Sequence, residues 1–346
     1  MMKRKWICIF LAAMLLSLTA CDQAGTKVVL TTGFAKNEVF RIEDMSCRLP
    51  EAMVYLVTMQ NQYEEVYGEE IWQVKRDGVT LAENVKETVL AKIAQVKTLN
   101  LLAESKQVSL DASEKEQAGK AAAEYYESLS EEEIVYLGIS EKLLVTMYEE
   151  YALAEKVYED IIKDINPEIS DDEARIITVQ HILIKTYIMD GTGAWLDYTE
   201  IAKSNAYKTA EKVCALAQSG EQDFESLIAQ YSEDAVGTYS FGKGEMTESF
   251  EEAAFNLSMN EISGIVEDKY GYHIIKCIST FNREETDRNK LTIVEQRKKE
   301  VFGMEYDAFV ETLTRMLNEE LWKEVKLADE PIGTLDFFDI FDKYFP

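Results

Sequence analysis

Between residues 50 and 165, apolar side chains recur three or four positions apart, which is the period of an amphipathic helix. One stripe begins at Pro50, which suits a first helical turn because its missing N–H costs no hydrogen bond there. A second stripe runs through residues 80–107, and a third begins after Ser140 and comprises Leu143, Leu144, Met147, Tyr151, Ala154, Tyr158, Ile161 and Ile165. The pattern predicts a helical module, preceded by an extended segment over residues 38–48.

The pattern changes after Asn166-Pro167-Glu168, because proline interrupts a helix and marks a boundary. Residues 175–185 alternate and are rich in β-branched side chains, which predicts a strand. The elements expected after it are helices over 205–219 and 223–231, a loop over 233–245, a short helix over 249–256, and strands over 262–267 and 272–279. Residues 168–282 are therefore expected to form a compact α+β domain.

Residues 283–327 return to a charged amphipathic helix, and residues 334–346 are aromatic and acidic. We expect these aromatic side chains to dock on the protein; an exposed patch for other chains is the alternative. A helical flank has no reason to be stable with its apolar stripe in water, so residues 283–346 are expected to pack on residues 21–167. The α+β domain, residues 168–282, would then be inserted in a discontinuous helical module. A separate C-terminal helix, forming the seam of a homodimer or an exposed arm, is the alternative.

The first 20 residues have the features of a targeting segment, with three basic residues at positions 3–5 and an apolar run over residues 6–18. That run is too short to span a bilayer comfortably. Leu18-Thr19-Ala20-Cys21 resembles the bacterial lipobox, in which the Cys thiol receives a diacylglycerol before cleavage. The resemblance implies acyl chains such as palmitate on Cys21 and attachment to the extracytoplasmic face of the cell membrane. An ordinary signal peptide is the alternative.

The mature chain would be strongly acidic. The formal net charge is −28, and loss of three basic residues with the first 20 gives −28 − 3 = −31. Such a surface disfavours nucleic acid and anionic lipid headgroups as partners. Besides Cys21, the mature cysteines are Cys47, Cys214 and Cys277, without CxxC or zinc spacing. We expect these three to be small buried or unpaired residues, and we expect no metal site.

Both histidines of the chain, His181 and His273, fall in predicted strands of the α+β domain. A single strand histidine is more often a core residue with satisfied hydrogen bonds than a catalyst. Two in terminal strands of one small domain could be neighbours across a sheet. Without a third ligand nearby, they make a poor metal site.

Five segments resemble, in order, the motifs of the parvulin family of peptidyl-prolyl cis-trans isomerases. They are His181-Ile182-Leu183-Ile184, residues 223–234, Phe241-Gly242-Lys243-Gly244-Glu245-Met246, residues 250–255 and Tyr270-Gly271-Tyr272-His273-Ile274-Ile275. The matches extend over residues 175–280. The resemblance implies a small antiparallel sheet with helices, and cofactor-free isomerisation of X-Pro bonds.

The resemblance also implies the site residues. The candidate catalytic residues are His181, Asp234 and His273. The candidate substrate-binding residues, which would form the apolar pocket for the proline ring, are Met246, Phe250 and Phe255. Isomerisation makes no covalent bond and crosses a barrier of about 18–20 kcal/mol, so an apolar grip with fixed polar groups suits its twisted transition state. Plain core packing is the alternative for the three apolar residues.

Three departures from the family pattern bear on function. The run before Phe241 is Gly237-Thr238-Tyr239-Ser240, which makes a shorter loop than many parvulins have. Asp268 stands where Thr or Ser is common, and we expect it to change the hydrogen bonding of His273. Residues 189–193 lack the arginines that phosphate-requiring members carry after the first strand, so phosphate recognition is not expected.

The whole arrangement resembles the extracytoplasmic foldase lipoproteins of the PrsA type, with a parvulin domain inserted in a helical chaperone module like the N-terminal module of SurA. This implies a membrane-anchored foldase that isomerises X-Pro bonds in unfolded exported polypeptides. One alternative is a chaperone whose parvulin domain is weakly active or inactive. Another is a solute-binding lipoprotein, but that class needs two α/β lobes, and the long helical segment over residues 50–165 argues against it.

Overall fold

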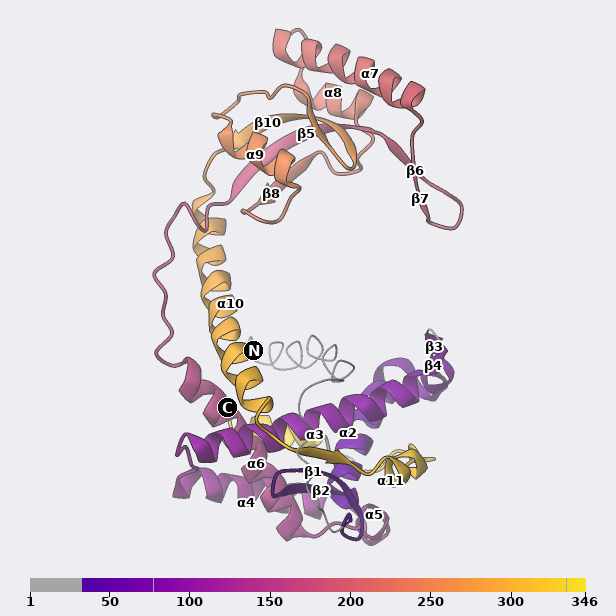
Figure 1. Ribbon diagram of the computed structural model, residues 1–346, viewed down its shortest axis with the longest axis vertical. Coiled ribbons are helices and arrows are strands. Elements are labelled where there is room, and N and C mark those ends of the chain that lie inside the picture. Colours follow the sequence, from indigo (N-terminus) through magenta and orange to yellow (C-terminus); the bar gives the residue numbers. More distant parts are fainter. Residues whose placement is uncertain (1–32, 77, 334) are drawn as a thin grey trace. The chain divides into compact units, whose positions relative to one another are not determined.

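The computed structural model describes residues 33–76, 78–333 and 335–346. It divides into two compact units: a helical unit built from residues up to 164 together with 301–346, and an inserted unit of residues 165–300 (Figure 1). The expected α+β fold, with one domain inserted in a discontinuous helical unit, is thus confirmed. The lipobox and the targeting segment lie outside the described residues. Among those described, no helix is both long and apolar enough to cross a membrane.

The N-terminal part of the helical unit follows the apolar stripes. Its helices are α2 (Leu49–Tyr67), α3 (Leu81–Ser105), α4 (Ala112–Glu127), α5 (Glu131–Leu137) and α6 (Glu141–Ile162), with a 3₁₀ turn η1 (Glu69–Gln73) and a short hairpin of β3 (Lys75–Arg76) and β4 (Val79–Thr80) between α2 and α3. Capping boxes begin α3, α4 and α5 at Thr80, Asp111 and Ser130, which satisfies amide groups that a helix start leaves free. The expected helices are confirmed to within a few residues.

A small sheet joins the two ends of the helical unit. Strands β1 (Glu38–Ile42), β2 (Met45–Arg48) and β11 (Arg315–Leu317) pair antiparallel in the order β11-β1-β2. The prediction of continuous helix over residues 283–327 is therefore wrong. Helix α10 (Arg283–Val310) ends, β11 pairs with β1, and a short helix α11 (Glu319–Glu324) follows. Pairing with the free edge of a distant strand outweighs the local helical period.

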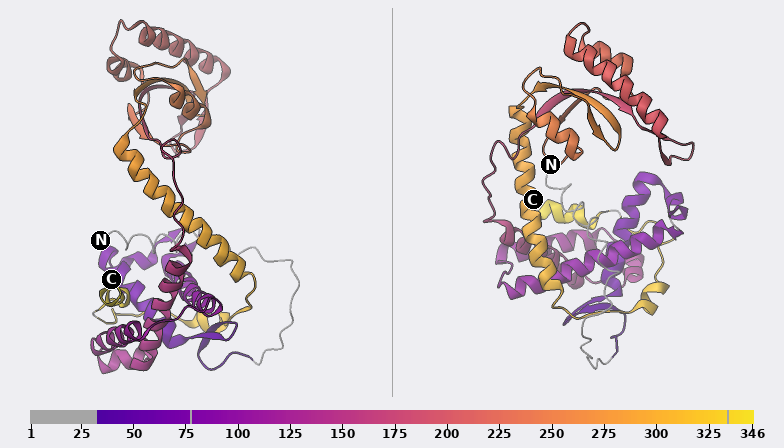
Figure 2. Two further views of the ribbon diagram at one scale, coloured as in Figure 1. Left: turned by 90° about the vertical axis from the view of Figure 1, so that its left-hand side faces the viewer. Right: turned by 45° about the horizontal axis from the view of Figure 1, so that its top comes forward.

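The aromatic C-terminus docks in the core of the helical unit, as expected. Helix α12 (Phe337–Tyr344) buries Phe337, Ile340 and Phe341. The Phe337 ring stacks on that of Tyr148 with centroids 4.2 Å apart. Figure 2 shows this yellow helix among the helices of the N-terminal segment.

The core of the helical unit also contains ionised groups. The Lys97 Nζ lies 2.8 Å from Glu51 Oε1 and 2.6 Å from Glu150 Oε2, and all three side chains are buried or nearly so. Burial raises the pKa of Glu51 to about 7, with Glu150 adding to the effect and Lys97 opposing it. Two carboxyl groups thus share one ammonium ion, and one of them, Glu51, holds its proton to a higher pH than an ordinary glutamate does.

The inserted unit is a four-stranded antiparallel sheet with helices on both faces (Figure 1). The strand order is β8-β5-β10-β9, from Thr238–Phe241, Ile177–Lys185, Gly271–Ser279 and Val266–Asp268 respectively. Helices α7 (Glu200–Ser219) and α8 (Phe224–Tyr231) pack on one face with Ile182 and Ile274. Helix α9 (Glu248–Asn256) packs on the other face with Val179 and Ile275. Since side chains alternate along a strand, His181 and His273 share the α9 face.

Three features of the inserted unit differ from the sequence prediction. The expected loop over residues 233–245 contains β8, and the expected strand over 262–267 is reduced to β9 and a single bridge between Ile262 and Lys276. A hairpin of β6 (Tyr187–Met189) and β7 (Trp195–Asp197) follows β5. Its turn is made by the Asp190 carboxylate, which accepts hydrogen bonds from backbone amides, a local device that apolar periodicity does not reveal.

The three cysteines that the structure describes, Cys47, Cys214 and Cys277, are buried and free, as expected.

Candidate active site

The two histidines meet between the central strands of the inserted unit. In the antiparallel register of β5 and β10, His181 lies opposite Ile275 and His273 opposite Leu183. This diagonal arrangement places Nδ1 of His181 3.2 Å from Nδ1 of His273, with the rings 15° from parallel. Both side chains are buried. The expectation that they are neighbours across a sheet is confirmed.

A carboxylate stands at each end of the histidine pair. His181 Nε2 lies 3.1 Å from Asp234 Oδ2, and His273 Nε2 lies 2.9 Å from Asp268 Oδ1. His181 Nε2 also lies 3.3 Å from the carbonyl oxygen of Val236, which can only accept. The four side chains form one hydrogen-bonded row, Asp234–His181–His273–Asp268, which we call the histidine row.

The acceptors decide where the protons of the histidine row lie. Each Nε2 faces a carboxylate, so each is satisfied when it carries a proton, and the Nδ1 atoms form a hydrogen bond when one proton lies between them. The row is therefore complete with three protons on four ring nitrogens, that is, one imidazolium and one neutral imidazole between two carboxylates. Burial, aided by the proximity of His273, lowers the pKa of His181.

Hydrogen bonds hold both carboxylates ionised. Burial opposes ionisation of Asp234, but the Val236 amide, the Tyr239 hydroxyl at 2.9 Å and His181 outweigh it, and its pKa is lowered. Burial likewise opposes ionisation of Asp268, yet hydrogen bonds from His273 and from the Thr247 hydroxyl at 2.6 Å lower its pKa to about 2. The expected effect of Asp268 on the hydrogen bonding of His273 is confirmed.

The aromatic ring of Phe250 closes the α9 side of the histidine row. It meets both imidazoles edge-on, with its centroid 5.5 Å from that of His181 and 5.1 Å from that of His273. Phe250 is buried, whereas Met246 and Phe255 are half-buried members of the same apolar cluster. The ring of Phe255 packs on Phe241, with centroids 5.8 Å apart. The structure thus brings Phe250 to the histidines and places Met246 and Phe255 beside it in the cluster.

Sequence reasoning missed two members of the site, Tyr239 and Thr247. The Tyr239 hydroxyl, on β8, donates a hydrogen bond to Asp234. Thr247 occupies the N-cap position of α9, and its hydroxyl donates to Asp268. The signal for Tyr239 was its place in the shortened run before Phe241. No local feature of the sequence pointed to Thr247, because its role depends on the folded sheet turning Asp268 toward the start of α9.

The arrangement suits a reaction that redistributes charge without making bonds. At the twisted transition state the amide loses resonance, and a water-poor apolar surface with fixed charges favours that state. Phe250 and its cluster supply the apolar surface, and the histidine row supplies the fixed charges. In the part of the chain that the structure describes, no cluster of three or more His, Cys, Asp or Glu could hold a metal ion.

Comparison with known proteins agrees with this geometry. Residues 181–279 match the family described as the PPIC-type PPIase domain, a rotamase. The chain is 28% identical over 264 residues to the foldase protein PrsA of Caldanaerobacter subterraneus subsp. tengcongensis, covering 73% of this chain and 78% of that protein. It is 23% identical to the foldase protein PrsA of Clostridium botulinum over 345 residues, covering 91% and 90%.

Shorter alignments reach higher identity. The foldase protein PrsA of Geobacillus kaustophilus is 38% identical over 100 residues, covering 27% of this chain and 32% of that protein. Among solved structures, the peptidylprolyl isomerase PrsA of Bacillus cereus aligns at a TM-score of 0.37 and 20% identity, covering 87% of this chain and 96% of that one. The inserted unit is thus a parvulin-type peptidyl-prolyl cis-trans isomerase domain, carried by a chain that is similar to the PrsA foldases well beyond that domain.

Proposed function

We propose that this protein is a lipid-anchored foldase that isomerises X-Pro bonds in unfolded polypeptides outside the cytoplasm. The observation that carries the proposal is the histidine row packed against Phe250, within a domain of the parvulin family. The apolar run over residues 6–18 and the lipobox-like sequence before Cys21 support export and anchoring.

The roles within the site follow from its geometry. Phe250, with Met246 and Phe255, grips the proline ring and keeps water from the twisting bond. His181, Asp234 and His273 present fixed charge and hydrogen bonds to the redistributed charge of the amide. Unfolded chains are the natural substrates because they populate both the cis and the trans isomer of an X-Pro bond, whereas an ordered fold normally locks one isomer.

The reaction does not require a phosphorylated substrate. A phosphate group is held in proteins mostly by arginine and lysine, and residues 187–197, which follow the first strand of the sheet, contain neither. A phospho-Ser-Pro peptide is therefore expected to be turned over no faster than a Glu-Pro peptide. Strong acceleration by the phosphate would contradict this.

Isomerase activity is tested with the mature full-length chain on Ala-Pro and Glu-Pro peptides. Uncatalysed isomerisation takes roughly 10–100 s at 25 °C, so catalysis is easily detected. Asp234→Ala should lower kcat/KM by about tenfold or more, because it removes a fixed charge from the histidine row. Glu211→Ala removes an exposed carboxylate from α7 on the opposite face and should have no effect. A folded wild-type protein without activity on any X-Pro peptide would favour a chaperone that only binds its clients.

Anchoring is tested by Cys21→Ala. The variant should be released from the membrane fraction or remain unprocessed, whereas the wild-type protein should need detergent for release. Membrane association that is unchanged in the variant would exclude the lipid on Cys21 as the anchor.

A further inference from the structure

The Asp268 carboxylate is held in one orientation at the His273 end of the histidine row. Its Oδ1 accepts hydrogen bonds from the Tyr270 amide at 2.7 Å and the Gly271 amide at 3.3 Å, besides the bond with His273 Nε2. Its Oδ2 accepts from the Thr247 hydroxyl at 2.6 Å. The side chain of Asp268 is only 4% exposed, so water has little access to it. The carboxylate is therefore a fixed, buried acceptor.

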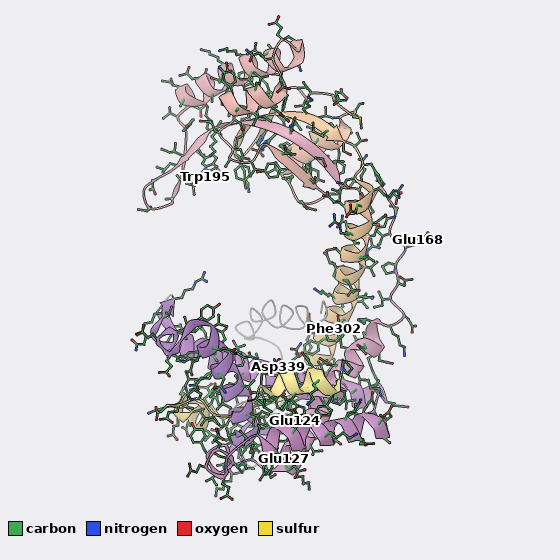
Figure 3. The ribbon with its side chains drawn as sticks, turned by 180° about the vertical axis from the view of Figure 1, so that it is seen from behind. Glu124, Glu127, Glu168, Trp195, Phe302 and Asp339 are labelled. Carbon is green, nitrogen blue, oxygen red and sulfur yellow. The ribbon has the colours of Figure 1, made fainter. Side chains whose placement is uncertain are left out.

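The turn that carries this carboxylate is braced by a neighbouring element. The Tyr270 ring lies 5.8 Å from the ring of Trp195 and 6.3 Å from that of Tyr187, both on the β6–β7 hairpin. Figure 3 shows Trp195 on this hairpin. Because the Tyr270 amide is one of the donors to Asp268, these ring contacts help to hold the carboxylate toward His273.

The residue at this end of the row decides how many protons the row needs. Thr or Ser, common here in parvulins, has a hydroxyl that both donates and accepts, whereas an ionised carboxylate only accepts. With a hydroxyl, both histidines can be neutral. The hydroxyl would donate to Nε2 of His273, the Nδ1–H of His273 to His181, and the Nε2–H of His181 to Asp234. Such a row is satisfied with two protons on its four ring nitrogens.

A carboxylate at this end requires one proton more. Nε2 of His273 has to carry a proton, because it faces an Asp268 oxygen that cannot donate. Nε2 of His181 has to carry one as well, since it faces Asp234 and the Val236 carbonyl oxygen. The two Nδ1 atoms, 3.2 Å apart, then need a third proton between them. The histidine row of this chain therefore holds an additional proton.

The other ionisable groups of the row keep their charge while this proton titrates. Although burial opposes it, hydrogen bonds lower the pKa of Asp234, and the pKa of Asp268 is about 2. Burial and Asp234 raise the pKa of Tyr239 to about 12, so its hydroxyl stays protonated. Burial lowers the pKa of His181, which makes an additional proton on the imidazoles costly. The remaining charged groups near the row are exposed and screened by solvent; they are Glu233, Glu248, Glu252 and Lys269.

We propose that Asp268 is a positioning residue that makes isomerisation depend on an additional proton in the histidine row, so that activity falls when rising pH removes this proton. After its loss, two Nδ1 lone pairs face each other, or a bare Nε2 faces a carboxylate, and either contact is repulsive. The rings then leave the edge-on contacts with Phe250 that close the α9 side of the site. The inference rests on the proposed function and adds regulation by pH to it.

The first measurement is kcat/KM of the mature full-length protein on a blocked Ala-Pro peptide, which has no ionisable group, from about pH 5.5 to about 9.5. Wild-type kcat/KM should fall about tenfold through this range. Asp268→Thr, which supplies a hydroxyl, should change less than about twofold. The matched control is Glu267→Gln, which removes an exposed carboxylate one residue earlier on β9, on the opposite face, and should keep the wild-type profile.

The second measurement counts the protons without using catalysis. The chain contains two histidines, both in the row, so ¹⁵N labelling of histidine in protein made without a tag reports these two rings alone. Nitrogen chemical shifts distinguish protonated from bare ring nitrogens. The wild-type row should hold three protons at the acid end and two at the alkaline end, with the same midpoint as kcat/KM. Asp268→Thr should hold two already at neutral pH.

The outcomes separate this inference from the isomerase function. Two protons in the fully active wild-type row, different midpoints for proton loss and activity, or an unchanged profile in a folded Asp268→Thr variant would each overturn the inference. If near-UV circular dichroism shows that Asp268→Thr does not fold, the wild-type proton count and its midpoint decide, because they need no variant. A wild-type protein inactive at every pH would refute the isomerase function, and with it the dependence of activity on the proton.

Discussion

Phe337 provides a direct test of whether the helical unit depends on its C-terminal segment. Its ring is fully buried and is surrounded by tyrosines, stacked on Tyr148 at 4.2 Å and edge-on to Tyr125 at 5.9 Å. The Tyr148 hydroxyl donates at 3.1 Å to the Phe337 carbonyl oxygen. One side chain thus joins helix α12 to helices α4 and α6, which precede it by about 190–220 positions in the sequence.

The cost of Phe337→Ala follows from this burial. Replacing a buried Phe by Ala usually lowers the free energy of unfolding by about 3–5 kcal/mol. The tyrosine rings around Phe337 are themselves buried, which hinders collapse of the cavity, and each lost aromatic pair adds about 0.5–1.5 kcal/mol. We expect a loss of about 4 kcal/mol, in the middle of that range, unless undocking of α12 alone costs less and caps the loss at a smaller value. A typical domain has only about 5–15 kcal/mol in total.

The assay is urea unfolding followed by far-UV circular dichroism, with isomerase activity measured in parallel. The helical signal of Phe337→Ala should be lost at much lower urea, while activity on a short Ala-Pro peptide in buffer should persist, because the inserted unit has its own core. Leu335→Ala, which alters a 39% exposed side chain in the same segment, is the control and should change stability little.

A loss below about 1 kcal/mol in Phe337→Ala would refute the reasoning, since a ring with no exposed surface cannot be removed so cheaply. A second test removes the segment that follows Val310. If the truncated protein still unfolded cooperatively and at the same urea concentration as the full chain, the N-terminal helices would be stable without that segment. Either result would favour the alternative in which the C-terminal segment is an arm.

Three further predictions address charge and backbone. The pKa of Glu51 is about 7 in the folded protein, against an ordinary value of 4.5, so the folded state holds this proton more tightly than the unfolded state does. The free energy of unfolding should therefore fall by about 3 kcal/mol as pH rises from 4.5 to 7, and Glu51→Gln should flatten this pH dependence in urea unfolding. The pKa of Asp268 is instead lowered from 3.8 to about 2. The ionised carboxylate therefore adds about 2 kcal/mol to the free energy of unfolding above pH 4, and this contribution is lost as pH falls through 2. Asp268→Asn should abolish this acid-dependent loss of stability in the inserted unit, as measured by near-UV circular dichroism. Gly271→Ala should disrupt the inserted unit, because φ at this position is +140° and the new Cβ would lie 2.2 Å from the Ile184 carbonyl oxygen. Gly264→Ala is the control, since its new Cβ would meet open space and should be tolerated. Equal melting temperatures for the two variants would contradict this.

Local patterns in the sequence account for much of the fold. The helices of the N-terminal part lie where the apolar period and the caps at Thr80, Asp111 and Ser130 predict them. Both signals act within a few residues along the chain, so they are legible without knowledge of the rest. The ordered motifs likewise pointed to His181 and His273 as partners, because a matching family pattern already contains the long-range information.

Other features depend on contacts between residues far apart in sequence. Residues 315–317 lie within the segment 283–327, whose apolar pattern predicted a helix. They form β11 instead, because the edge of β1 offers them hydrogen bonds. The sequence showed Asp268 to be unusual, but only the folded sheet brings its carboxylate within 2.9 Å of His273 and orients Thr247 toward it. Local periodicity determines which face of an element is apolar; strand register and the pairing of polar groups are decided by the free energy of the whole packed domain, which no short segment contains.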